Sequence, residues 1–245
     1  MPGAQDFTLQ NGDSWFYSKT SGVHTPTQLR NMYEQSSGSN TGLIIDIAPF
    51  PNGSVPAPQV AAAQALGKYV TGCYGKPVAT GNGSATTITI QVGGASVDRV
   101  QIREDQSQGQ RVRAFKLTAT PAGSDGAATN VPLQCHSCTA SGCTSVRTEL
   151  SSIGNKFICI LSTPQKMASI TLEVTESEGT PVISELSTFG GCGALGSAID
   201  AKWVASTTSD ESSESSAASD ASETAGACTT HAHCQFNGVC TAGAW

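Results

Sequence analysis

Apolar positions follow a helical period in the first third of the chain. Leu29, Met32 and Tyr33 are spaced so that they fall on one face of a helix. Thr25 is a favoured N-cap, and Pro26 suits the first helical position because its missing N–H is not needed there. The pattern therefore predicts a short amphipathic helix that begins at Thr25 and Pro26.

A nearly continuous apolar run follows at Leu43–Ala48, and it predicts a strand buried on both faces, as in a parallel sheet covered by helices. A second helix is predicted at about 58–70. Its expected inner stripe consists of Val60, Ala63, Leu66 or Gly67, and Val70. Residues 1–12 show neither period and are predicted to form a loop.

The period changes to two from about residue 86. Short stretches of alternating apolar and polar residues, separated by turn residues, are typical of half-exposed strands. At least six such stretches predict an antiparallel β-sandwich. They lie at 87–92, 97–103, 111–120, 157–161, 169–174 and 181–186.

Composition narrows the class of protein. The 245 residues carry a net charge of −6 and only 13% are charged, so the basic surface of a nucleic-acid-binding protein is absent. No apolar run reaches the length of a membrane span. Nine cysteines favour an oxidising compartment with disulfides, and the odd number leaves at least one thiol without a partner in the chain.

Two further features bear on the compartment. Asn52 and Asn82 each begin an Asn-Gly-Ser triplet, which is a glycosylation acceptor if the protein is secreted. The first six residues have neither the basic start nor the apolar run of a signal peptide. We therefore expect a secreted or lysosomal protein whose true N-terminus lies upstream.

Cysteines gather in one predicted loop of the sandwich. Cys135, His136, Cys138 and Cys143 could hold zinc, but a loop disulfide is the expected reading in a secreted sandwich, so no metal site is predicted. The disulfide candidates are Cys135, Cys138, Cys143, Cys159, Cys228, Cys234 and Cys240.

The C-terminal residues differ from all others in composition. Residues 193–226 are rich in Ser, Ala and acidic residues, and we expect a disordered linker there. In 227–245 three cysteines are each separated by five residues, and Asn237-Gly238 precedes the last, which predicts a partial EGF-like module. His231 and His233 leave metal binding as an alternative.

Several separated motifs resemble one enzyme family. Trp15-Phe16-Tyr17, the segment 33–40 (Y-E-Q-S-S-G-S-N) and the segment 43–55 (L-I-I-D-I-A-P-F-P-N-G-S-V) follow one another as do motifs at the end of the catalytic barrel of α-L-fucosidases. In the predicted sandwich, 97–112 resembles the family's V-x-L-x-E-D-x-x-x-G-Q-R-V, and 152–156 resembles its T-I-G-x-K. The resemblance covers roughly residues 2–190.

The resemblance implies a multidomain fold, with the C-terminal end of a (β/α)8 barrel followed by an antiparallel β-sandwich. The expected boundaries are 1–80 for the incomplete barrel and 82–192 for the sandwich. A complete barrel needs roughly 200 residues or more, so residues 1–80 cannot close one.

The resemblance also implies hydrolysis of terminal α-L-fucose from glycans by double displacement between two carboxyl groups, without a cofactor. No residue matches the family's nucleophile or its sugar-binding histidines, so no catalytic residue is assigned and this chain alone is predicted to be inactive. Trp15 is the expected substrate-binding residue, packing against the apolar face of fucose. The alternative is that Trp15, Phe16 and Tyr17 pack between barrel and sandwich.

Two carboxylates are given no catalytic role, and a second class of function remains open. Asp46, at the end of a predicted strand, is expected to hydrogen-bond a neighbouring loop, and Asp6 has no assigned proton-transfer role. Fucosylated glycans are the expected partners, and neither nucleic acid binding nor a membrane span is expected. The alternative function is a non-catalytic extracellular carbohydrate-binding or adhesion protein built on the sandwich.

Overall fold

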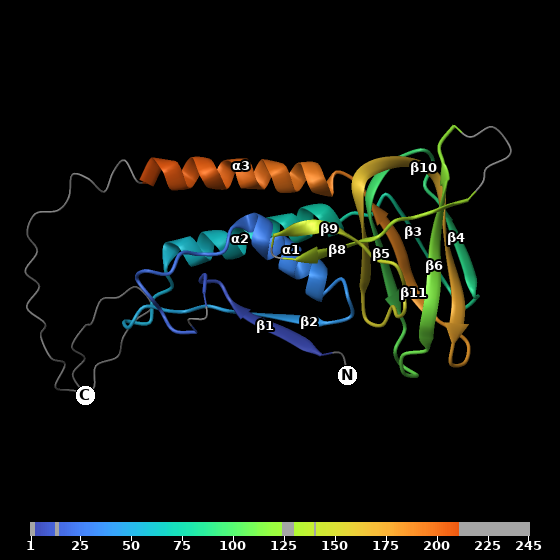
Figure 1. Cartoon of the computed structure of the whole chain (residues 1–245), viewed down its shortest axis with the longest axis horizontal. Helices are drawn as coiled ribbons and strands as arrows, with labels where there is room; N and C mark the ends of the chain where they lie inside the picture. The colour runs from blue at the N-terminus through green and yellow to red at the C-terminus, as the bar shows by residue number, and fades with distance from the viewer. Residues whose placement is uncertain (1–2, 13–14, 124–129, 140, 211–245) are drawn as a thin grey trace, which may run out of the picture.

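The computed structural model describes residues 3–12, 15–123, 130–139 and 141–210. A unit of helices and two short strands lies at one end, and a β-sandwich lies at the other (Figure 1). In the first unit, a long helix, a pair of helices and a two-stranded sheet are stacked in three layers. The candidate site lies in this unit.

The two-stranded sheet pairs β1 (Ala4–Thr8) in parallel with β2 (Gly42–Asp46), and α1 (Pro26–Ser36) connects them. The prediction of a loop for residues 1–12 is therefore wrong for residues 4–8. β1 is short and largely polar, and its partner lies about forty residues away, so no local period marks it. The helix is as expected: Thr25 accepts a hydrogen bond from the backbone of Gln28, whose side chain in turn accepts one from the backbone of Thr25.

β2 is not buried on both faces as predicted. Ile44 is 49% exposed and Ile47, just after the strand, is 48% exposed. The helices cover only one face of the sheet, where Phe7 and Ile45 pack against the cluster that contains Leu9. The sheet face that carries Ile44 is therefore open.

The second helix, α2 (Ala57–Tyr74), is longer than predicted. Its buried face is shifted by about one residue from the face that the predicted inner stripe defines. Val60, Ala63 and Gly67 are exposed, whereas Leu66 is buried as expected. Three of the buried residues, Gln59, Tyr69 and Cys73, are not aliphatic, so a search for an aliphatic stripe could not reveal them. The buried positions are Gln59, Ala62, Ala65, Leu66, Tyr69 and Cys73.

The sandwich is antiparallel throughout, as its period-two pattern predicts. One long strand, β10 (Phe157–Ser177), joins its layers, because its first half pairs with β5 and its second half lies between β4 and β6. Two predicted strands, 157–161 and 169–174, are thus parts of a single one. The other expected strands are β4 (Thr87–Gln91), β5 (Ser96–Glu104), β6 (Val112–Pro121) and β11 (Ile183–Phe189).

Four further strands of the sandwich were not predicted. They are short or consist mainly of small and polar residues, so they show little alternation. They are β3 (Ala79–Gly83), β7 (Val131–Pro132), β8 (His136–Thr139) and β9 (Gly142–Val146). The core lies between the layers and includes Val100, Ile102, Leu117, Ile170 and Leu172.

After the sandwich the chain forms α3 (Cys192–Asp210), which returns along α2 to the helical unit (Figure 1). A disulfide joins Cys192 to Cys73 at the end of α2, and Arg30 of α1 forms an ion pair with Asp200 at 3.1 Å. The prediction of a disordered linker from residue 193 is therefore wrong up to residue 210. The predicted remainder of the linker, 211–226, and the predicted EGF-like module lie outside the described residues.

Candidate functional site

A pocket of about 290 Å³ opens beside β1 and the loop that follows it. It is lined by Asp6, Phe7, Thr8, Gly12, Trp15 and His24. The pocket combines a carboxylate, an imidazole and an indole. Trp15 is the substrate-binding residue expected from the sequence, and the structure places Asp6 and His24 beside it.

The backbone brings these side chains together from two segments. β1 carries Asp6, and the loop after it turns back so that His24 donates its backbone N–H to the Leu9 carbonyl at 2.9 Å. An isolated antiparallel bridge between Gln10 and Val23 closes the same turn. The loop thereby places His24 next to β1 immediately before α1 begins.

The pocket lies at the end of the unit away from the sandwich. The C-terminal end of α1 meets the sandwich, where the Ile158 N–H bonds the Gly38 carbonyl at 3.0 Å. Because α1 connects two parallel strands, it runs opposite to them, and the carboxyl end of β1 points the other way (Figure 1). The aromatic loop therefore does not pack between the helical unit and the sandwich. Trp15 is 51% exposed and Phe16 is 86% exposed.

The aromatic loop is held by one buried side chain. Gln10, 1% exposed, donates to the Phe16 carbonyl at 2.9 Å and accepts the Ser18 N–H at 3.0 Å. Tyr17 packs edge-on against Phe50, from the loop after β2, with 4.5 Å between ring centroids. The backbone from Phe16 to Ser18 is thus held by Gln10, and Tyr17 is held by Phe50.

The charges in the pocket suit a neutral polar ligand. Burial lowers the pKa of His24, and a hydrogen bond with Gln28 opposes this only in part, so the imidazole is neutral at pH 7. A neutral imidazole offers one donor and one acceptor, and the exposed Asp6 carboxylate offers acceptors. The Trp15 ring adds an apolar face. Sugar hydroxyls and C–H groups are matched by such a set.

Sequence reasoning missed His24 and Gln10. The signal for His24 was its place directly before the N-cap Thr25, since residues between a strand and the following helix lie where the strand ends. Gln10 carried no such signal, because its importance depends on the path of the loop. Asp46 does not line the pocket. Its backbone carbonyl accepts the Leu9 N–H at 2.9 Å, which joins β2 to the segment after β1.

The two glycosylation acceptors lie at the surface. Asn52 is in the turn after β2, where its side chain accepts hydrogen bonds from the Ser54 N–H at 3.0 Å and the Ser54 hydroxyl at 2.8 Å. Asn82 is exposed on β3. Both asparagines are therefore accessible, and their modification stays a prediction.

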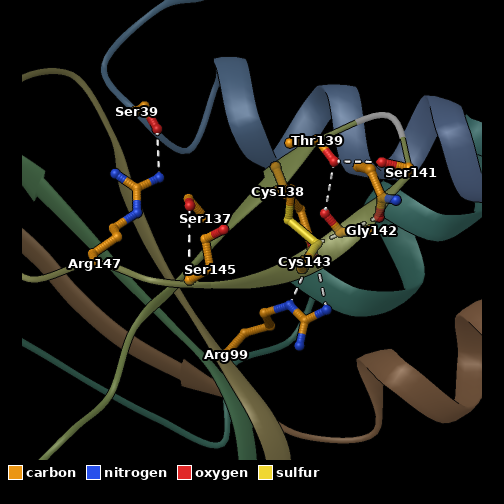
Figure 2. Close-up of a disulfide and its surroundings, with 12 residues drawn as sticks. Ser39, Arg99, Ser137, Cys138, Thr139, Ser141, Gly142, Cys143, Ser145 and Arg147 are labelled. Atoms are coloured by element: carbon orange, nitrogen blue, oxygen red, sulfur yellow. Dashed lines mark hydrogen bonds and ion pairs between the residues drawn. A yellow bond between two sulfur atoms is a disulfide. The ribbon is translucent and has the colours of Figure 1, made fainter.

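The cysteine loop forms disulfides. Cys138 pairs with Cys143 across the β8–β9 hairpin, and Cys135 pairs with Cys159 of β10. Four of the seven disulfide candidates are thus paired, Cys73 and Cys192 were missed, and Cys228, Cys234 and Cys240 lie outside the described residues. Figure 2 shows the hairpin disulfide with Arg99 beside it.

A buried polar cluster lies beneath this disulfide. Glu34 of α1 accepts hydrogen bonds from Arg99 of β5 at 2.7 Å and from Tyr69 and Tyr74 of α2 at 2.5 and 2.7 Å. Glu34 also lies near Cys138 and Cys143, as a metal-binding group would. Both sulfurs are in the disulfide and the carboxylate is already paired with Arg99, so this cluster is a poor metal site. Because its members come from α1, α2 and β5, it joins the helical unit to the sandwich.

Comparisons with known proteins bear on the fold. No family model and no curated protein matches this chain. Among solved structures, one described as a putative α-L-fucosidase from Bacteroides thetaiotaomicron has 23% sequence identity and a TM-score of 0.66, and the match covers 77% of this chain and 40% of that chain. A glycoside hydrolase 29 family member from an unknown rumen bacterium has 22% identity and a TM-score of 0.65, covering 77% and 32%.

A third structure is a Ruminococcus gnavus glycoside hydrolase 29 fucosidase in complex with fucose. It has 18% identity and a TM-score of 0.59, and the match covers 76% of this chain and 41% of that one. This chain therefore spans less than half of the length of these three structures and shares their fold over about three quarters of its own length.

Among the described residues, no helix is long and apolar enough to cross a membrane.

Proposed function

We propose that this chain is the C-terminal part of an α-L-fucosidase, a retaining glycoside hydrolase that is secreted or lysosomal and acts on fucosylated glycans. One observation carries the proposal: the pocket with Trp15, Asp6 and His24 lies beside β1 in a fold that the chain shares with fucosidase structures. In this function Trp15 packs against the C–H face and methyl group of the sugar, while His24 and Asp6 face its hydroxyls.

The open face of the β1–β2 sheet supports the barrel part of the proposal. Ile44 is half exposed on this face. At the side of the sheet that faces the helices, Ile47 is also half exposed, and it lines a groove of about 450 Å³ between β2 and α2. Exposed apolar surface of this kind marks a site of contact with other protein surface. Further parallel strands and helices of a barrel would cover it.

The chemistry of retaining hydrolysis requires two carboxyl groups about 5–5.5 Å apart. Among the described residues that line the pocket, Asp6 is the single carboxylate. The nucleophile would come from the covering strands, and this chain would supply one wall of the sugar site. It follows that this chain alone hydrolyses no fucoside.

The alternative function, a sandwich that binds carbohydrate by itself, gains no support. Sugar-binding surfaces commonly present aromatic rings, and the sandwich segment 82–192 has three aromatic residues. Phe115, Phe157 and Phe189 are all buried. The exposed Trp15 and Phe16 lie in the other unit, at the end away from the sandwich.

The test uses the purified chain with L-fucose and 4-nitrophenyl α-L-fucoside. We expect fucose to bind, the affinity to fall in Trp15→Ala, and no nitrophenol to be released. Equal fucose binding by wild type and Trp15→Ala would contradict the placement of the sugar. If the wild type releases nitrophenol and Asp6→Asn abolishes this turnover, the chain contains a complete catalytic site. That result would overturn the proposal that the nucleophile comes from strands outside this chain.

A further inference from the structure

A groove of about 430 Å³ lies between α2 and α3, which run side by side in opposite directions (Figure 1). Its α2 wall extends from Ala61 to Lys68, which is about two helical turns or about 10 Å. The volume lies within the range of roughly 300–1,000 Å³ that is typical of sites for small molecules. The residues that line it are different from those that line the pocket with Trp15, so the groove is separate from the candidate site.

The lining of the groove is mainly apolar. Ala65 is buried between the helices, and Leu195 and Ile199 are half-buried beside it. Ala61 and Ala198 also line the groove, and their short side chains leave the space between the helices open. An apolar surface of this shape suits an apolar chain that lies along the two helices.

The walls of the groove are fixed by contacts that need no ligand. A disulfide joins Cys73, near the end of α2, to Cys192 at the start of α3. Further along α3, Asp200 forms an ion pair with Arg30 of α1 at 3.1 Å, and Trp203 packs against the apolar cluster of the helical unit. Because the walls are already in place, little conformational freedom is lost when a ligand binds.

Two lysines line the groove, Lys68 from α2 and Lys202 from α3. Both are exposed, and among the described residues neither ammonium group has a hydrogen-bond or ion-pair partner. No residue of the lining is acidic, since Asp200 is turned towards Arg30. In a chain with a net charge of −6, this groove is therefore a local site of positive charge.

We propose that the groove binds a small amphiphilic anion from solution, with its apolar chain between α2 and α3 and its anionic head group at Lys68 and Lys202. The apolar lining accounts for the chain, and two cations without a carboxylate account for the head group. Lysine stems cover apolar surface while their ammonium groups stay in water, so the head group would lie at the rim of the groove. This inference does not depend on the proposed function.

One pair of variants tests the head group. Lys68→Gln/Lys202→Gln removes both charges from the groove. Lys76→Gln/Lys166→Gln removes two charges from exposed lysines that do not line it. Each double variant changes the net charge of the chain by the same amount, so a difference between them reports the position of the charges.

A second pair tests the position of the chain. Ala198→Phe places a ring in the groove. Ala201→Phe places the same ring at an exposed position of α3 that does not line the groove. Both alanines are exposed, so neither ring is forced into a core.

The experiment measures the dissociation constants of octanoate, hexanoate, 1-octanol and octyltrimethylammonium for the full chain by calorimetry. In the wild type we expect octanoate to bind about three- to tenfold more tightly than 1-octanol, as two exposed charge pairs provide. Hexanoate should bind about four- to sixteenfold more weakly than octanoate, because each buried methylene contributes about fourfold. Octyltrimethylammonium should bind more weakly than 1-octanol.

The variants should divide these effects. Lys68→Gln/Lys202→Gln should bring octanoate and 1-octanol to nearly equal affinity, and Lys76→Gln/Lys166→Gln should keep the wild-type ratio. Ala198→Phe should weaken the binding of both by tenfold or more, and Ala201→Phe should leave both unchanged.

Each contrary outcome overturns the proposal. Absence of octanoate binding in the wild type would show that the groove takes no such ligand. An octanoate affinity that falls equally in both lysine variants would show that only the net charge matters. Binding that Ala198→Phe leaves unchanged would place the ligand elsewhere, for instance on the open face of the β1–β2 sheet. If Ala198→Phe does not fold, the comparison of the lysine variants still decides where the head group lies.

Discussion

At the scale of single residues, the buried carboxylate of Glu34 connects the two units. It is 1% exposed, and its partners come from α2 and β5. Removing one member of a buried ion pair leaves an uncompensated charge, which typically costs about 3–5 kcal/mol. We expect Arg99→Met to lower the free energy of unfolding by about that amount, measured by urea denaturation.

The matched controls separate charge from packing. In Glu34→Gln/Arg99→Met the tyrosine hydroxyls keep an acceptor and no charge is buried, so most of the loss should be recovered. Arg113→Met removes an ion pair with the exposed Glu178 and should leave the free energy of unfolding nearly unchanged, because solvent screens exposed pairs. A double variant as unstable as Arg99→Met would show that packing, and not the charge, carries the effect.

His24 should make stability depend on pH. Burial lowers its pKa in the folded protein, so below pH 6.5 the unfolded chain binds more protons at this residue than the folded one. The contribution of His24 to stability is therefore complete above pH 6.5 and is lost as the pH falls through and below that value. His24→Gln should flatten the stability profile between pH 7 and 5, measured by urea denaturation at each pH. An unchanged slope would contradict this assignment.

At the scale of elements, α3 depends on its disulfide. Cys73–Cys192 closes a loop of 119 residues, whereas Cys138–Cys143 closes one of five. Longer loops lose more entropy on closure in the unfolded chain, so replacing both cysteines of the first pair by serine should cost about 4–5 kcal/mol and the second about 2 kcal/mol. Hydrogen exchange should accelerate along α3 only when the first pair is removed. Equal protection of α3 in both variants would contradict the anchoring role.

The elements that the sequence predicts are those with a strong local period. α1, β4, β5, β6 and β11 show it, and the structure contains all of them. β1 lacks it, since its place is determined by a parallel partner distant in sequence. The composition of α3 is typical of a linker, so the sequence did not predict this helix. Its contacts with α1 and α2 come from a few residues, such as Asp200 and Trp203, which are too few to give a helical pattern.

The candidate site was predictable only in part for a related reason. Trp15 was found through a motif, which is local. His24 and Asp6 come together with it because the loop after β1 turns back on itself, and a bridge between Gln10 and Val23 closes that turn. Nothing in the spacing of these residues indicates that turn, so only the tertiary structure could show the pocket.

At the scale of the whole molecule, the open face of the β1–β2 sheet has a measurable consequence. Ile44 lies exposed on this open face, Ile47 lines the groove formed with α2, and exposed apolar surface next to strand edges promotes association. We expect the isolated chain to self-associate at micromolar concentrations. Ile44→Asp/Ile47→Asp should make it monomeric, with little effect on the free energy of unfolding because neither side chain is in a core.

Sedimentation velocity measures this association, and Val131→Asp is the control. Val131 is 48% exposed on the sandwich, so it matches the two isoleucines in exposure but lies on the other unit. Its replacement should leave association unchanged. If the sheet face is instead covered by barrel strands in a longer protein, the isoleucine variant should destabilise that protein by several kcal/mol, as a charge placed in a core does. A variant tolerated equally in both contexts would show that no barrel packs on this face.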